Sequence, residues 1–349
     1  MAHVANAGVR WRSSLIVMST LSVLLPFKDA AATLDRAIAS IIAQSHSNWQ
    51  LLLIDNASSD AGRAIAAAWA RRDHRIRLIE EPRIGIAHAL NIGLIHADTP
   101  FIARMDADDE ADPDRLAQQF AYLDAHPEIG VLGTRTRFAS TVAQHSGMRA
   151  FVEWQNALLS PHDHYVKRFV DAPLAHPTVM FRRELIDLHG RYDTGPLPED
   201  HELWLRWMHQ GVRFAKLPQA LLTWHDHSDR LSRTNTNYST DAFFRTKVRW
   251  LALWLKRVLQ DRPLIIAGTS RLCQGRAAML ADHGITIHGF TDVSGRQAPG
   301  HAFIPHDRLP PPGEVFIVSF ISQRGTGDRI AAYLAGRGMV EGVDHILAA

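Results

Sequence analysis

The sequence has almost none of the residues that cross-link a chain. Cys273 is its only cysteine, so an intrachain disulfide is excluded, and so is a zinc site built from paired cysteines. No apolar run approaches the roughly 20 residues that a membrane-spanning helix needs. The formal net charge is only +2, which gives no reason to expect a nucleic-acid partner. From these features we expect a cytoplasmic protein.

The N-terminal residues allow two interpretations. Arg10 and Arg12, followed by an apolar run over 15–27, have the order of a secretory signal. Polar residues interrupt that run, and cleavage behind it would remove the first strand of the core. We therefore favour a start at Met18, with residues 1–17 as a disordered leader.

Strand and helix patterns alternate along the first half of the chain, which predicts βαβ units, a parallel sheet and helices on both of its faces. Thr33 is the expected N-cap of the first helix. Ligands of such sheets bind beyond the carboxyl ends of the strands, where the acidic loops 55–60 and 106–114 lie. The predicted strands are 21–27, 50–54, 76–79 and 100–105, and the predicted helices are 33–44, 60–72 and 86–97.

A second alternating series follows residue 263, so the 349 residues divide into two α/β blocks. A long helical pattern over 241–260 separates the blocks. The expected elements of the second block are strands at 264–268, 285–291 and 314–320 and helices at 270–283 and 325–338.

The acidic sequence Arg104-Met-Asp106-Ala-Asp108-Asp109 directly follows a predicted strand. Carboxylates two residues apart on a turn can bind one divalent cation through hard oxygen ligands. Such a cation can bridge two phosphates and neutralise a departing nucleoside diphosphate. A solvated acidic loop is the plainer alternative.

Asp55 ends another predicted strand, within Asp55-Asn56-Ala57-Ser58-Ser59-Asp60. Its carboxylate can accept hydrogen bonds from a base or a ribose. Asp60 or Ser58 can instead cap the following helix, and both roles are compatible.

Several segments resemble, in order and spacing, the family 2 glycosyltransferases of the GT-A fold. The resemblance implies an inverting transfer of a hexosyl or N-acetylhexosaminyl group from a nucleotide-sugar donor to a saccharide or lipid-linked acceptor, assisted by Mn²⁺ or Mg²⁺. It also implies surface-polysaccharide or glycolipid assembly. The segments are Leu21–Asp29, Leu53–Asp60, Gly85–Gly93, Ala103–Leu116, Ala175–Arg183 and Glu199–Arg206.

The resemblance assigns roles to individual residues. Asp55 falls at the nucleobase, Asp106 at the ribose and diphosphate, Asp108 at the metal, and Asp200, beside Glu199, at the catalytic base. Glu199 and Asp200 also suit the N-cap and first turn of a helix. The other implied residues are Pro26, Asp29, Arg83 and Arg230 on the donor side, His227 at the metal, and His176 and Trp204 on the acceptor side.

Two departures from the family pattern stand out. Asn56 occupies a position where the family often has Asp, and His225 follows Trp224 where many relatives have Arg. The stretch 224–233 otherwise looks like the family's closing loop, in which Arg230 and Arg233 can pair with phosphate. Both histidines of this loop can also be ordinary surface residues.

The helix 241–260 interleaves aromatic and basic residues. Peripheral contact with an anionic membrane is one interpretation, and packing between two domains, which we favour, is the other. The block behind it resembles the Rossmann-like domains appended to some of these transferases. Only Gly268 of a dinucleotide fingerprint is present, and Asp292 lies where a ribose-binding acid would, so we expect a structural or partner-binding role.

The expected organisation is thus a leader at 1–17, a GT-A domain at 18–240, a linking helix at 241–262 and a Rossmann-like domain at 263–349. A nucleotidyltransferase is the rival enzyme class, but the Gly-rich basic loop that such enzymes carry after the first strand is missing. A catalytically silent glycan- or partner-binding relative is the other rival, against which Asp106, Asp108 and Asp200 argue.

Overall fold

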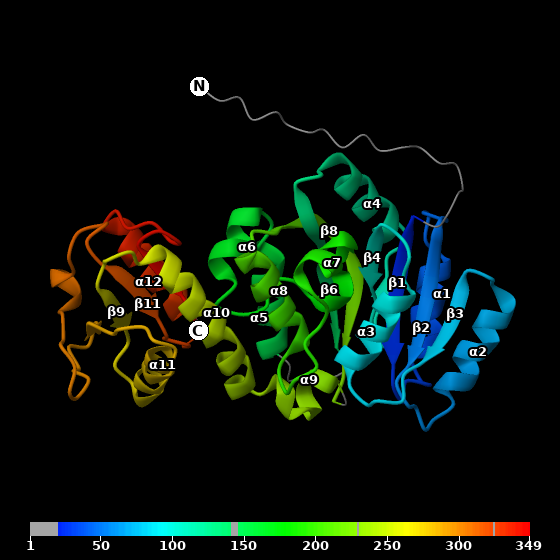
Figure 1. The fold of residues 1–349 in the computed structure, drawn as a ribbon, viewed down its shortest axis with the longest axis horizontal. Coiled ribbons are helices and arrows are strands. Elements are labelled where there is room, and N and C mark those ends of the chain that lie inside the picture. Colours follow the sequence, from blue (N-terminus) through cyan, green and yellow to red (C-terminus); the bar gives the residue numbers. More distant parts are fainter. Residues whose placement is uncertain (1–19, 141–145, 229, 324) are drawn as a thin grey trace.

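The computed structural model describes residues 20–140, 146–228, 230–323 and 325–349 (Figure 1). The predicted leader 1–17 and the start at Met18 lie outside these residues. The described chain forms two sheets, one of eight strands and one of four. No helix among the described residues is long and apolar enough to cross a membrane.

One half of the large sheet is the predicted parallel βαβ arrangement. Its strand order is β3-β2-β1-β4, with all neighbours parallel. The strands are β1 (Leu21–Phe27), β2 (Trp49–Asp55), β3 (Ile76–Glu80) and β4 (Phe101–Arg104), and the helices between them are α1 (Leu34–Ile42), α2 (Gly62–Arg72) and α3 (Ile86–His96).

The other half makes the sheet mixed, whereas the alternating pattern predicted only the parallel strands of the first half. β7 (Met180–Arg182) runs antiparallel to β4 and to β6 (Ile129–Ser140). The long β8 (Arg213–Asp226) then pairs parallel with β6, and β5 (Glu110–Ala111) closes the edge. The other helices of this part are α4 (Arg115–Ala125), α5 (Ser146–Ala157), α6 (Pro161–Lys167), η1 (His176–Thr178), α7 (Glu184–His189), α8 (Glu199–His209), α9 (Leu231–Thr234) and η2 (Thr236–Tyr238).

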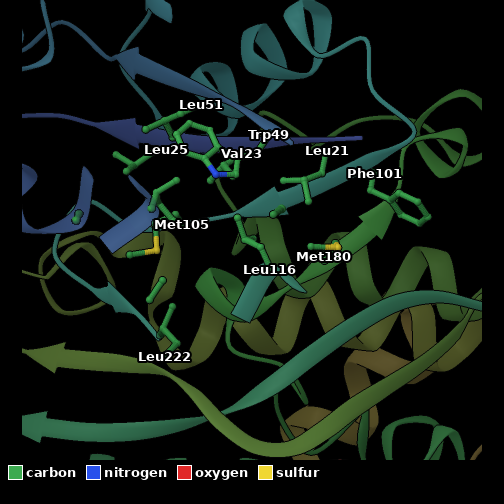
Figure 2. Close-up of a cluster of buried hydrophobic side chains, with 14 of the residues drawn as sticks. Leu21, Val23, Leu25, Trp49, Leu51, Phe101, Met105, Leu116, Met180 and Leu222 are labelled. Atoms are coloured by element: carbon green, nitrogen blue, oxygen red, sulfur yellow. The ribbon is translucent and has the colours of Figure 1, made fainter. Parts of the chain in front are cut away.

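Helices cover both faces of the large sheet, as predicted. Every residue of β1 is buried, because alternate side chains enter the two cores on opposite faces. Leu21, Val23 and Leu25 point into the core under α1, α2 and α4. Figure 2 shows these side chains together with Met105, which directly follows β4. Leu24 points into the core under α3, α7 and α8.

Two of the capping predictions have different outcomes. Thr33 is the N-cap residue of α1, as predicted, but its hydroxyl donates to the Ala30 carbonyl (3.4 Å) and caps no amide, so the expected capping bond is absent. The Asp60 carboxylate accepts from Gly62 N (2.8 Å), the first amide of α2, and from Ala31 N (2.7 Å). Asp60 therefore fixes the start of α2 and ties it to the loop after β1.

The small sheet is parallel throughout, in the order β10-β9-β11-β12. The strand expected at 285–291 begins only at Gly289, and the last strand was not predicted. The elements are β9 (Leu264–Ala267), α11 (Arg271–Asp282), β10 (Gly289–Thr291), η3 (His306–Arg308), β11 (Phe316–Ser319), α12 (Thr326–Gly336) and β12 (His345–Leu347).

Helix α10 (Thr240–Val258) lies between the two sheets (Figure 1). Phe244, Trp250 and Trp254 are buried in one core with Phe169 of the first part and Phe316 of the second. The packing interpretation is therefore confirmed, and these aromatic side chains are not available to a membrane. Lys247, predicted on a solvated basic face, is also buried.

Candidate active site

The acidic loop after β4 brings three carboxylates together. Oxygen atoms of Asp106, Asp108 and Asp109 lie within 4.8 Å of one another. Asp106 and Asp108 are partly buried, whereas Asp109 is fully buried. The sequence did not single out Asp109 as a ligand. One of its oxygens accepts from His225 N (2.9 Å), which attaches the acidic loop to the end of β8.

Arg230 places one positive charge among these three carboxylates. Its guanidinium lies 3.4 Å from Asp106, 3.6 Å from Asp108 and 3.1 Å from Asp109. It also stacks over the Trp224 ring, 4.5 Å from the centroid. The three negative charges raise the pKa of Arg230 against the cost of its burial, so it stays charged.

His227 joins the same group, since its Nε2 lies 2.9 Å from Asp108 Oδ2. Arg233, in contrast, pairs with Asp226 at the end of β8 (2.8 Å). The structure thus brings Asp106, Asp108, Arg230 and His227 to one place and leaves Arg233 outside it.

The donor set fits a hard divalent cation. It offers carboxylate oxygens, which Mg²⁺ and Mn²⁺ prefer. Oδ2 of Asp109 is buried and has no hydrogen-bond partner among the described residues. Burial and the neighbouring Asp108 and Asp106 raise the pKa of Asp109, so the group would gain from a further positive charge. Arg230 alone does not balance three carboxylates.

Asp55 ends β2 on the donor side and is buried. Its Oδ1 accepts from Ser58 N (3.0 Å), which closes the turn that follows. The structure explains the neighbouring Asn56. Its amide donates to the carbonyls of Glu81 (3.0 Å) and Arg83 (2.8 Å) and accepts from Gly85 N (2.8 Å). A carboxylate could not donate those two bonds, so here Asn fits the loop and Asp would not.

The other expected donor-side residues are held by protein partners. Arg83 pairs with the buried Glu81 (2.8 Å), and this pairing lowers the pKa of Glu81 to about 2. Asp29 has a left-handed backbone (φ 50°), and its carboxylate accepts from Ser59 N (2.7 Å). That bond and Lys28 lower the pKa of Asp29 to about 2. Pro26 is buried within β1 opposite Ile54, which favours a structural role for its ring.

The predicted catalytic pair opens α8. Neither residue is the N-cap, which is Pro198, but both lie in the first turn as expected. Glu199 is buried, and one of its oxygens accepts from the Tyr238 hydroxyl (2.5 Å). Asp200 is only partly buried and accepts from His201 N (2.7 Å). Asp200 is therefore the member of the pair with a carboxylate open to a substrate.

Burial raises the pKa of both carboxyl groups. The negative charges of Asp171 and Asp106 raise that of Asp200 further. A base with a pKa above the usual carboxyl range is better matched to proton transfer near neutral pH. The influence of Asp106 also means that the donor-side acids and Asp200 belong to one electrostatic environment.

Arg104 links the two groups of acids and was missed by the sequence reasoning. It is buried at the end of β4 and pairs with Asp106 Oδ1 (2.6 Å). Its charge also lowers the pKa values of Glu199 and Asp200 against their burial. The available signal was a charged residue ending an otherwise apolar strand.

The two expected acceptor residues are buried. Trp204 has no exposed surface and packs edge-on against His176 (5.8 Å) and Phe214 (5.6 Å). Its ring has no free face for a sugar, so the structure argues against the acceptor role. His176 lies 2.9 Å from the Tyr192 hydroxyl and 3.7 Å from Glu199 Oε1, and burial lowers its pKa well below the usual value. His176 therefore supports Glu199 from inside the protein.

In the small sheet, the Asp292 carboxylate is hydrogen-bonded to residues of the loops after β9 and β10. It accepts from Thr269 N (3.2 Å), from the Thr269 hydroxyl (3.1 Å) and from the Ser294 hydroxyl (2.6 Å). Gly268 has φ +103°, and a Cβ there would lie 2.7 Å from Cys273 Sγ. The retained glycine thus serves a close approach between β9 and α11.

Comparison with known proteins agrees with this geometry. Residues 22–189 match the model of glycosyl transferase family 2. The putative glycosyltransferase EpsE of Bacillus subtilis is 34% identical over 230 residues, which are 63% of this chain and 78% of EpsE. The amylovoran biosynthesis glycosyltransferase AmsE of Erwinia amylovora is 28% identical over 223 residues, 63% of this chain and 81% of AmsE.

Solved structures show the same fold. S. aureus TarS 1-349 in complex with UDP-GlcNAc superposes with a TM-score of 0.55 at 16% identity, covering 76% of this chain and 71% of that chain. The mannosyltransferase PcManGT of Pyrobaculum calidifontis, in complex with GDP-Man and Mn²⁺, gives 0.50 at 18% identity, covering 76% and 73%. The described sheet is the curled, mixed α/β sheet of the GT-A fold. The chain belongs to glycosyltransferase family 2 and is a glycosyltransferase.

Proposed function

We propose that the chain is an inverting, metal-dependent transferase that moves a hexosyl or N-acetylhexosaminyl group from a nucleotide-diphosphate donor to a saccharide or lipid-linked acceptor. The observation that carries this proposal is the meeting of two groups of acids around the buried Arg104. Asp106, Asp108 and Asp109 form one group, and the partly open Asp200 belongs to the other.

In the proposed step Asp200 takes the proton of an acceptor hydroxyl. The hydroxyl oxygen forms the new bond to the anomeric carbon, and the bond from that carbon to the diphosphate oxygen breaks. The electron pair leaves with the nucleoside diphosphate, and attack from the opposite side inverts the configuration. The raised pKa of Asp200 suits this proton transfer.

On the donor side, Asp55 is suited to contact the base, and Asp106 the ribose and diphosphate. Asp106, Asp108 and Asp109, with His227, would hold Mn²⁺ or Mg²⁺. A bound divalent cation supplies positive charge to the departing diphosphate. Arg230 is the positively charged side chain that pairs with Asp106 and Asp109. When the donor binds, its guanidinium is suited to exchange these carboxylates for a phosphate.

The relatives suggest a biological setting. AmsE is named for amylovoran biosynthesis, and an O-antigen biosynthesis glycosyltransferase of Escherichia coli, WbnJ, is 25% identical over 231 residues. We propose that this chain also assembles a bacterial surface polysaccharide in the cytoplasm. In the proposed division, 18–240 form the catalytic domain, 241–262 the linking helix, and 263–349 a Rossmann-like domain that stabilises the enzyme or binds a partner.

A donor screen tests the function. Purified protein is incubated with UDP-glucose, UDP-galactose, UDP-N-acetylglucosamine, GDP-mannose and dTDP-glucose, each with Mn²⁺ and with EDTA, and nucleoside-diphosphate release is followed. We expect slow hydrolysis of one donor with Mn²⁺ and none with EDTA. Release that is equally fast in EDTA would refute the metal requirement. No release together with no metal-dependent nucleotide binding by calorimetry would refute the proposed function.

A further inference from the structure

One short segment of the chain contacts both groups of acids. Its first part, after β8, brings His227 to Asp108 (2.9 Å) and Arg230 to Asp109 (3.1 Å). Its last part brings the Tyr238 hydroxyl to Glu199 (2.5 Å). The segment 227–238 lies beyond residues 22–189, which match the family model. Tyr238 also belongs to none of the sequence segments that resemble the family.

Tyr238 is held in place by the local structure on both sides of it. The Asn235 side chain accepts from Asn237 N (2.9 Å) and so caps the short helix η2, which ends at Tyr238. The next residue, Ser239, accepts from Ala242 N (3.3 Å) and caps α10. The position of the Tyr238 hydroxyl is therefore fixed where η2 ends and α10 begins.

The hydroxyl reaches the buried member of the catalytic pair. Glu199 accepts from Tyr238 through Oε2, and its Oε1 faces His176 Nδ1 at 3.7 Å. Oε2 thus has a hydrogen-bond partner inside the protein, whereas the neutral His176 lies beyond hydrogen-bond distance of Oε1. Hydrogen bonding from Tyr238 and the charge of Arg104 lower the pKa of Glu199, but its burial and the charge of Asp200 outweigh them, so the net shift is upward.

Fixing Glu199 also fixes the direction of Asp200. Consecutive side chains on an α-helix point about 100° apart, so Glu199 and Asp200 face different directions from the first turn of α8. With Glu199 turned toward Tyr238 and His176, Asp200 is left on the partly exposed side of α8. A Glu199 released from Tyr238 would be free to swing outward and would loosen the first turn that carries the base.

We propose that Tyr238 is a positioning residue for the catalytic base Asp200, acting through Glu199. This inference rests on the proposed function, in which Asp200 takes the proton. It also gives the segment 227–238 a second role, because the residues that touch the donor-side acids and the residue that orders the base then lie on one continuous stretch of chain.

The test compares Tyr238→Phe with a matched control. Tyr165→Phe also removes one phenol hydroxyl, which accepts from Trp254 of α10 (2.7 Å) and lies outside the acid groups. The probe is the donor from the panel above that the wild-type enzyme hydrolyses, with water in the place of the acceptor. We expect kcat of Tyr238→Phe to fall about tenfold while the donor KM stays within about twofold. Tyr165→Phe should keep the wild-type kcat.

A double-mutant cycle shows whether Tyr238 acts through Glu199. Once Glu199→Gln has removed the carboxylate, adding Tyr238→Phe should lower kcat no further. If Tyr238→Phe lowers kcat tenfold both in the wild type and in Glu199→Gln, the proposal is overturned. An unchanged kcat in the single variant Tyr238→Phe would also overturn it. The proposal would also be overturned if Tyr165→Phe lost kcat to the same extent and both variants had lower melting temperatures, because the loss of kcat would then reflect general destabilisation. If the wild-type enzyme shows neither donor turnover nor metal-dependent nucleotide binding, the proposed function itself fails, whereas a fully active Tyr238→Phe refutes only this inference.

Discussion

Replacing Arg230 by Met tests the electrostatic balance of the acidic loop. At an effective dielectric of about 20, one pair of charges 3.1 Å apart is worth about 5 kcal/mol, and Asp106 and Asp108 add to it. Burying the guanidinium, of which only 8% is exposed, offsets much of that attraction. The larger effect of the substitution is on the acidic loop, because Asp106, Asp108 and the buried Asp109 would lose the cation that lies among them. We expect the free energy of unfolding to fall by about 3 kcal/mol.

The loss is measured by thermal unfolding in EDTA and again in Mn²⁺. At ~2 °C per kcal/mol, the melting temperature in EDTA should fall by about 6 °C. Mn²⁺ should raise the melting temperature of Arg230→Met more than that of the wild type, because the three carboxylates no longer have Arg230 to balance them. A ligand that binds only the folded protein raises its melting temperature, and tighter binding of Mn²⁺ raises it more.

Arg63→Met provides the control, since Arg63 pairs with Glu80 on the surface and both side chains are more than half exposed. Exposed pairs contribute at most about 1 kcal/mol, so this variant should melt close to the wild type. If Arg230→Met also melts like the wild type in EDTA, the reasoning that Arg230 stabilises the acidic loop is wrong. If Mn²⁺ raises the melting temperatures of Arg230→Met and the wild type equally, Mn²⁺ and Arg230 do not compete for the same carboxylates.

Four further outcomes follow from the site and the cores. Asp200→Asn should lower donor turnover by at least about 100-fold with nucleotide affinity unchanged in calorimetry, and retained turnover would contradict its role as base. Because the pKa of Asp200 is raised, the wild-type rate should be lost as the pH falls through a range above the ordinary Asp value of about 3.9, and an acid limb at or below that value would contradict the assigned environment. Trp204→Leu should cost about 3 kcal/mol of stability, measured by thermal unfolding, with donor turnover per folded molecule preserved, whereas lost turnover in a stable variant would restore a substrate role for this side chain. Gly268→Ala should destabilise the small sheet by about 2 kcal/mol in thermal unfolding, because its φ is positive and Cys273 leaves no room for a Cβ, and an unchanged melting temperature would contradict this.

The local elements of the first half could be predicted from the sequence. Each buried parallel strand there is a short apolar run, and the helices between them carry apolar residues at helical spacing. The pairing of β6 with β8 could not be predicted, since it joins residues such as Val131 and Phe214 across more than 80 positions and includes register shifts at Thr134–Thr136. Alternation along one strand does not say which distant strand will be its neighbour.

The same limit applies to the site. Asp106, Asp108, Asp200, His227 and Arg230 were expected, and the structure brings the donor-side residues among them together. Arg104 and Tyr238 were missed, because what distinguishes them is the partner that the folded chain supplies. Arg104 opens the acidic sequence but was given no role there, and Tyr238 lies in no motif. Trp204 shows the opposite error. An aromatic side chain that could stack on a sugar and one that fills a core look alike in a sequence, and only burial separates them.

Helix α10 limits how freely the two parts of this enzyme can be exchanged with others. Because Phe244 and Trp254 complete one core with Phe169 and Leu205 before them and Phe316 after them, neither part has a finished apolar interior without this helix. A chain cut just before Thr240 would leave Phe169 and Leu205 facing water. Grafting residues 263–349 onto another transferase would require α10 and its contact surface to be transferred as well. Unfolding should accordingly proceed as one cooperative event, in which loss of the small sheet also destabilises the proposed base, Asp200, at the start of α8.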